Sequence, residues 1–257
     1  MRKCLLTLAL LLWATTADAA WTLVQTRTAC QAGCDVTDDW TNSTGVGGQI
    51  IVTGLTTTTA GNTLIIYATS DSDTRTVSSA TCNGDTVTAL HAEYNSRSAY
   101  LGGVVVATTG TSCTVTLNGA SLGAGASVVV QEWSGGAASL TEAGTSTGSI
   151  NSGATAHTAA TVTPSNAPVL YVSVLILSGS SGGMTHDADF TGATTGSGTV
   201  MYRAYREQAD TTAQGITFTS TNTRNSNLAL AALEGAAAGG GTCTGGLTLL
   251  GAGKCDE

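Results

Sequence analysis

The feature that most constrains the fold is a recurrence of short apolar runs separated by Gly, Asn or Asp. The runs are rich in Val, Ile, Thr and Tyr, a pattern typical of an antiparallel many-stranded protein. Residues 114–118 and 216–219 alternate apolar with polar side chains, which predicts strands with one buried face. We expect strands at 21–28, 48–55, 62–70, 86–92, 98–108, 112–118, 126–133, 156–163, 168–178, 199–207, 215–222 and 226–234.

Helical spacing is not sustained over three turns in any window. Residues 227–238 favour a helix on propensity alone, but Leu228 and Leu230 alternate with alanines, as in a strand. Charged residues make up only 10 % of the chain and hydrophobic residues 42 %, which suffices for a core and excludes a disordered chain. We therefore predict an all-β fold, a two-sheet antiparallel β-sandwich of the jelly-roll type.

Two segments, 62–135 and 167–235, share an order of features. Each has an apolar strand, a polar loop with a His (His91 or His186), a long strand, a Thr/apolar strand and a closing strand that ends in Gly. This order predicts an internal duplication of a half-sandwich. Because each sheet needs the apolar face of the other, we expect one domain over 20–235.

The N-terminus has the features of a Sec-type signal peptide. Arg2 and Lys3 precede the apolar run Leu5–Trp13, and Ala17-Asp18-Ala19 follows with small residues at the positions that signal peptidase reads. We predict a signal peptide at 1–19, cleaved after Ala19 or Ala20, and a protein that is secreted, periplasmic or at the cell surface. The apolar run is too short to span a bilayer, so no membrane insertion is expected.

The charge balance argues against nucleic acid as a partner. The chain has a net charge of −8, and removal of Arg2, Lys3 and Asp18 makes it more negative by one. The mature chain would then keep a single lysine, Lys254, whereas binding to a phosphate backbone needs clustered Lys and Arg.

Six cysteines would remain after Cys4 leaves with the signal peptide. An even number in an oxidising compartment predicts disulfides, although six cysteines allow fifteen connectivities. No CxxC occurs, which disfavours a zinc site. Nearest-neighbour pairing is preferred: Cys30 with Cys34, Cys82 with Cys113 and Cys243 with Cys255.

The amino-acid composition of the chain changes after Gly235. Residues 236–241 read as a Gly/Ala linker, and residues 242–257 as a short tail closed by its two cysteines. We expect this tail to be removable without unfolding the sandwich.

Two motifs resemble a pattern in secreted bacterial β-sandwich proteins of unassigned role. They are Ala60-Gly61-Asn62-Thr63-Leu64-Ile65-Ile66 and Val128-Val129-Val130-Gln131-Glu132-Trp133-Ser134-Gly135. The motifs mark the starts and ends of strands rather than chemistry. The resemblance therefore implies a fold over 20–235 and no active site.

Catalytic signals are weak. Gly144-Thr145-Ser146-Thr147-Gly148 matches the G-x-S-x-G pattern of a nucleophile elbow, but the buried strand and the helix that this motif requires are not predicted around it. The segment reads as a flexible connector, and no catalytic residue is assigned.

Histidines and carboxylates supply a second group of candidates. His91 with Glu93 could form an acid–base or metal pair, with His157 as a third ligand. His186 lies beside Asp187 and Asp189. All of these read more simply as solvated polar residues near loop ends.

Closely spaced aspartates favour calcium as the one candidate cofactor. Asp71 and Asp73 place hard oxygen donors in a loop, as do Asp35, Asp38 and Asp39. No EF-hand spacing is present, and Asp in turns commonly bonds its own backbone.

One strand offers a candidate ligand-binding stripe. On 199–207, Val200, Tyr202 and Ala204 share one face, and Arg203, Tyr205 and Glu207 share the other. Tyr205 is the ring we expect to be more exposed. An exposed Tyr between Arg and Glu suits hydroxyl-rich ligands such as glycans.

These observations favour a secreted, non-enzymatic binding or structural module at a cell or particle surface, with an extracellular glycan or protein surface as partner. The alternative is a carbohydrate-active enzyme or glycan-binding module on a jelly-roll scaffold. An enzyme of that class needs paired carboxylates, for which Glu93 and Glu132 are the best candidates. Enzymatic activity and oligomeric state stay open at this point.

Overall fold

The computed structural model describes residues 20–30, 48–71, 74–95, 97–118, 126–148, 150–179, 182–195 and 201–236. All regular elements in these ranges are strands, as the pattern of short apolar runs predicted. Within them, no helix has the length and apolarity needed to cross a membrane. The predicted signal peptide and the predicted C-terminal tail lie outside the described residues.

The described residues form sixteen strands. Those of the first half are β1 (Thr22–Cys30), β2 (Gly48–Val52), β3 (Thr63–Ser70), β4 (Val77–Cys82), β5 (Asp85–Thr86), β6 (Thr88–Glu93), β7 (Ser98–Val105), β8 (Cys113–Leu117) and β9 (Ser127–Ser134). Those of the second half are β10 (Gly136–Thr147), β11 (Ile150–Val162), β12 (Val169–Leu177), β13 (Met184–His186), β14 (Thr191–Thr195), β15 (Met201–Gln208) and β16 (Gln214–Gly235).

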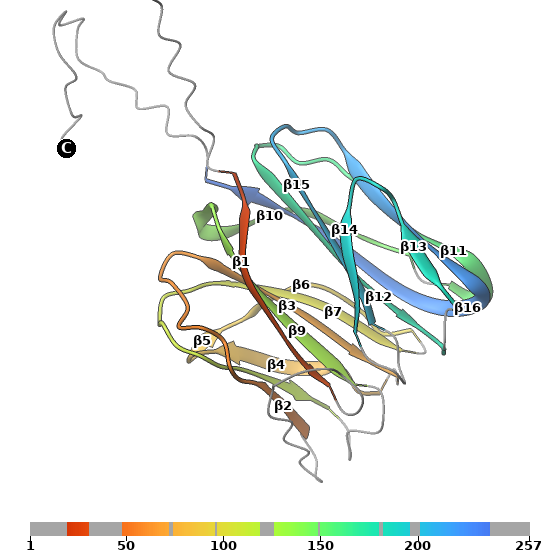
Figure 1. Ribbon diagram of the computed structural model, residues 1–257, viewed down its shortest axis with the longest axis horizontal. Coiled ribbons are helices and arrows are strands. Elements are labelled where there is room, and N and C mark those ends of the chain that lie inside the picture. The colour runs from red at the N-terminus through yellow and green to blue at the C-terminus, as the bar shows by residue number, and fades with distance from the viewer. Residues whose placement is uncertain are drawn as a thin grey trace, which may run out of the picture.

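The strands build a stack of layers (Figure 1). An outer sheet, β2-β8-β4-β5, covers one face of an inner sheet, β1-β9-β3-β7-β6. The other face of that inner sheet packs on a second inner sheet, β10-β16-β12-β15-β14, and β11 and β13 pair with the first part of the long strand β16 as a second outer layer. Two sandwiches thus lie back to back.

Three hydrophobic clusters fill the spaces between layers. The first, with Ile66 and Val115, lies between the first outer sheet and the first inner sheet. The second, with Ile65 and Val172, joins the two inner sheets. The third, with Phe218, lies under the second outer layer. Because the inner sheets are covered on both faces, β3 and β12 are buried at every position, which explains their nearly continuous apolar sequences.

The two halves have the same order of strands. Each inner sheet begins with the first strand of its half, followed by the last strand and then the third. In the first half β7 and the edge strand β6 come next, and in the second half β15 and the edge strand β14. The full orders are β1-β9-β3-β7-β6 and β10-β16-β12-β15-β14. In each outer layer the central strand pairs with the second and the fourth strand: β8 with β2 and β4, and the first part of β16 with β11 and β13. Within the described residues β5 has no counterpart.

Two local expectations need correction. The segment 144–148 is no flexible connector, because Gly144 to Thr147 form the end of β10 and pair with Ala232 to Ala229 of β16. The expected strands 215–222 and 226–234 are one continuous strand, β16, which serves the outer layer with its first part and the inner sheet with its second. The strand expected at 226–234 is confirmed as part of β16, and packing overrides the helical propensity of these residues.

The pairing of Cys82 with Cys113 is confirmed. The two residues lie opposite one another on β4 and β8, with Cα atoms 4.0 Å apart. Both are buried in the first cluster, so the bond fastens the outer sheet from within. The other two predicted pairs lie outside the part of the chain whose side chains are described.

We predict that the double substitution Cys82→Ala/Cys113→Ala lowers the free energy of unfolding by roughly 3–4 kcal/mol, because a loop of about thirty residues is no longer closed in the unfolded chain. Urea unfolding of the unmodified protein and of the variant, both oxidised, measures the difference. Non-reducing peptide mapping that joins Cys82 to another cysteine would contradict the prediction.

Candidate functional site

The packing of the two inner sheets separates the three residues of the predicted stripe on β15, which are Arg203, Tyr205 and Glu207. Tyr205 is partly buried and lies edge-on to Trp133, with ring centroids 4.8 Å apart. Arg203 and Glu207 line two separate hollows on either side of it. The alternation of the two faces is as expected, since Tyr202 and Ala204 belong to the third cluster and Tyr205 packs on the second. The three side chains thus do not converge on one ligand, and their role in binding stays a prediction.

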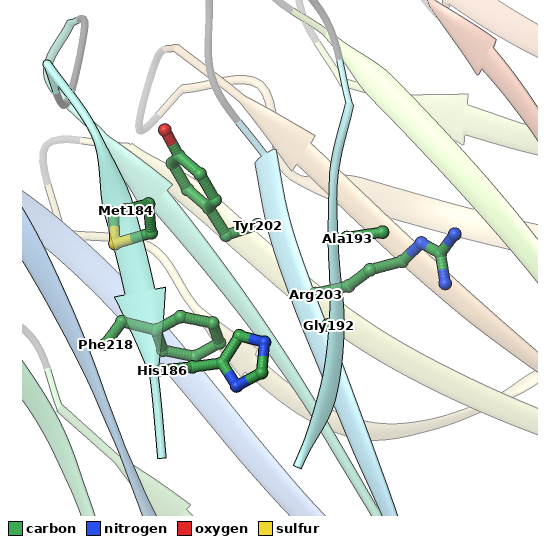
Figure 2. A pocket seen from close by; sticks show the side chains of 7 residues that line it. All are labelled: Met184, His186, Gly192, Ala193, Tyr202, Arg203 and Phe218. Atoms are coloured by element: carbon green, nitrogen blue, oxygen red, sulfur yellow. The ribbon is translucent and has the colours of Figure 1, made fainter. Parts of the chain in front are cut away.

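The first hollow lies between β13 and β14, and residues of β15 and β16 complete its lining (Figure 2). It has a volume of about 110 Å³ and is lined by Met184, His186, Gly192, Ala193, Tyr202, Arg203 and Phe218. Figure 2 shows the Tyr202 hydroxyl and the Arg203 guanidinium pointing in different directions, away from the His186 ring. The polar groups therefore diverge.

His186 presents one ring nitrogen to that hollow. Its Nδ1 donates a hydrogen bond to the Asp187 carbonyl at 2.9 Å, which makes Nε2 the acceptor in the neutral ring. The ring meets Phe218 edge-on, with centroids 6.2 Å apart. Asp187 accepts from the Thr217 backbone N–H, and Asp189 pairs with Arg206 at 2.9 Å. The acids beside His186 are thus used in local structure.

Asp71 is held by arginine. Its Oδ1 accepts from Arg75 at 2.8 Å, and its carbonyl accepts from Arg97. Asp73, the second proposed calcium ligand, lies outside the described residues, as do Asp35, Asp38 and Asp39. The described residues contain no group of three or more His, Cys, Asp or Glu side chains placed to hold a metal. Calcium binding stays a prediction.

The buried carboxylate of Glu132 links the closing strand β9 to the turn before β3 and to β1, and we call this set of hydrogen bonds a glutamate clamp. Glu132 is 1 % exposed, and its carboxylate accepts from the Thr59 N–H at 2.8 Å, from Asn62 Nδ2 at 2.7 Å and from Gln25 Nε2. These donors lie in the turn before β3 and on the edge strand β1. The carboxylate thus joins the two motifs quoted above, one carrying Asn62 and the other carrying Glu132 itself.

Glu234 forms a second glutamate clamp, in the second half of the chain. It is 7 % exposed and accepts from the backbone N–H groups of Ser165 and Asn166 at 2.9 Å and from Asn166 Nδ2 at 2.7 Å. The hydrogen bond from the Asn166 side chain is the main reason why the pKa of Glu234 is lowered. In both halves a Glu near the end of the closing strand holds the turn before the central strand. A turn Asn followed about 70 residues later by a Glu gives no local signal, so sequence reasoning missed both contacts.

Glu93 and Glu132 are not a catalytic pair. Glu132 lies opposite Leu64, near the start of β3. Glu93 lies opposite Ala99, which in turn pairs with Thr69 near the end of β3. The two carboxylates are therefore at opposite ends of the inner sheet.

His157 is fully buried between two serines of β16. Its Nδ1 lies 2.8 Å from Ser226 Oγ and its Nε2 3.1 Å from Ser220 Oγ. Ser220 precedes the bend of β16 and Ser226 follows it, so the ring on β11 ties both parts of the strand together. Burial lowers the pKa of His157. Burial also lowers the pKa of His91, and the negative charge of Glu93 partly opposes this shift.

The outer layers present rows of hydroxyl groups. On the first, Thr81 lies opposite Thr114 and Ser79 opposite Thr116 across β4 and β8. On the second, Thr219 lies opposite Thr185, and Thr158 lies opposite Thr217 with their Oγ1 atoms 3.1 Å apart. All eight side chains are exposed or half-exposed and uncharged.

Comparisons of this chain with protein-family models, with curated proteins and with solved structures gave no match.

We predict that Glu132→Gln lowers the free energy of unfolding by about 2–4 kcal/mol, because an amide loses the charge and accepts through one oxygen only. The matched control is Glu93→Gln at the opposite end of the sheet, which should change the free energy of unfolding by less than about 0.5 kcal/mol. Urea unfolding measures both. Equal stability of the two variants would show that the clamp is not needed.

We predict that the protein loses stability as the pH falls below the ordinary His value of about 6.5, because unfolded chains take up a proton that buried His157 excludes. The slope contributed by one group is at most about 1.4 kcal/mol per pH unit. His157→Gln should reduce the slope between pH 7 and pH 5, and His91→Gln should leave the contribution of His157 in place. Chemical unfolding at several pH values measures the slope, and an unchanged slope in His157→Gln would contradict this assignment.

Proposed function

We propose that this chain is an exported, non-enzymatic binding or structural module that acts at a cell or particle surface. The observation that carries the proposal is the pair of uncharged, hydroxyl-bearing outer faces at the two ends of the stack. Neutral sheet faces of this kind suit a neutral hydroxylated partner, because hydroxyl groups both donate and accept hydrogen bonds.

The use of the ionisable groups supports the same proposal. Glu132, Glu234 and His157 are buried and spend their hydrogen bonds on holding turns and strands. The enzymatic alternative needs paired carboxylates, and the pair named from the sequence is separated along the inner sheet. The resemblance to secreted β-sandwich proteins of unassigned role is in keeping with an export-related module.

We further propose that the two halves arose by duplication. Their strand orders agree, and in both a Glu of the closing strand binds the turn before the central strand. A duplicated module would present two similar outer faces, which favours binding to an extended surface at two points.

A binding assay with insoluble neutral polysaccharides tests the proposed function. The exported protein should sediment saturably with at least one of chitin, cellulose or a β-glucan, and Thr81→Arg/Thr219→Arg, which places a cation on each outer face, should weaken retention about tenfold or more. Thr211→Arg, in the exposed loop after β15, is the matched control and should be retained like the unmodified protein.

The assay also separates the alternatives. Ordered self-association in sedimentation velocity that the double variant abolishes would support the structural form of the proposal. Release of soluble sugar from the same polymers would overturn the non-enzymatic assignment. Absence of both retention and self-association, or equal retention of the double variant, would overturn the role of the outer faces.

A further inference from the structure

A second hollow lies beside the point where the described chain begins. It has a volume of about 260 Å³ and is lined by Ala20, Trp21, Pro168, Glu207, Gln208 and Ala209. Pro168 precedes β12, and Glu207 and Gln208 end β15. The walls are largely apolar, and Glu207 is the one charged residue among these six. A hollow of this composition suits a small cationic group with apolar surroundings.

The backbone at Ala20 is held firmly in place. Trp21 is 2 % exposed and belongs to the cluster that joins the two inner sheets. Gly135 has a φ of +91°, and a Cβ at this position would collide with the Ala20 carbonyl. A Cβ at Gly136 would lie 2.8 Å from the Trp21 ring. The backbone at Ala20 and Trp21, directly after the predicted signal peptide, is thus held by these contacts.

Among the described residues around this hollow, Glu207 is the carboxylate that is free to bind. Within the described residues its side chain has no hydrogen bond or ion pair. The neighbouring charges are already used: Arg206 pairs with Asp189, Asp210 accepts from Gln208 and Thr212, and Glu234 holds Ser165 and Asn166. Glu207 is exposed, and desolvation by its surroundings raises its pKa, as expected for a carboxylate without a counter-ion.

We propose that this hollow binds the α-ammonium group that cleavage after Ala19 creates on Ala20, with Glu207 as its counter-ion. The α-ammonium is a small cation with three donors, and the fixed backbone at Ala20 and Trp21 places it at the rim of the hollow. This inference rests on the proposed export of the protein. It adds that the processed N-terminus is a structural element with its own binding site.

Selective labelling of amines tests the inference. The sequence has two lysines, Lys3 and Lys254, so the exported protein should carry two amines, the α-amine and Lys254. Reductive methylation with ¹³C-formaldehyde keeps their charges and gives one NMR signal for each. The pH titration of the α-amine signal should have a midpoint at least half a pH unit higher in the unmodified protein than in Glu207→Gln. The Lys254 signal is the internal control.

A second carboxylate variant controls for general charge effects. Glu142→Gln removes an exposed acid of β10 and should leave the α-amine midpoint unchanged. Equal midpoints in the unmodified protein and Glu207→Gln would overturn the inference, as would an exported chain that begins at Trp21. An exported chain that still begins at Met1 would instead contradict the proposed export, and the mass of the intact protein distinguishes these cases.

Discussion

The packing of the two inner sheets on each other is the constraint on which the rest of the structure depends. It covers the second face of β3 and of β12, so both strands are buried at every position. A strand buried on both faces has no polar alternation to set its register. The register must come from elsewhere, and the two glutamate clamps supply it.

Each clamp is a long-range bond between the end of one strand and the start of its neighbour. Asn62 and Glu132 are 70 residues apart in the chain, and Asn166 and Glu234 are 68 apart. A carboxylate that accepts several N–H donors in a buried position is costly to displace, because a shift of one residue leaves donors and charge unpaired. The clamps thus fix which residues of β3 and β12 face which layer. They also explain why Glu132, one of the two carboxylates named as catalytic candidates, has a structural role.

Much of the fold could be predicted from the sequence because the buried strands carry their own signal. The runs at Leu64–Tyr67 and Val169–Leu177 are strongly apolar, and Cys82 and Cys113 lie on strands of the same half. The strand β10 could not be predicted in this way. Its residues are small, polar and half-exposed, and it is a strand because β16 offers it a backbone to pair with. The clamps were missed for the same reason, since their partners meet only in the folded chain.

The two outer layers show how one topology can be fastened by different chemistry. In the first half a disulfide joins β4 to β8 across the sheet. At the second half's outer layer the buried ring of His157 joins β11 to β16 through two hydroxyl groups. A disulfide holds its layer in an oxidising compartment at any ordinary pH, whereas a neutral buried histidine holds its layer only while it stays unprotonated. Among the described residues, the second outer layer therefore carries a contact that is sensitive to acid, and the first outer layer carries a bond that is sensitive to reductant.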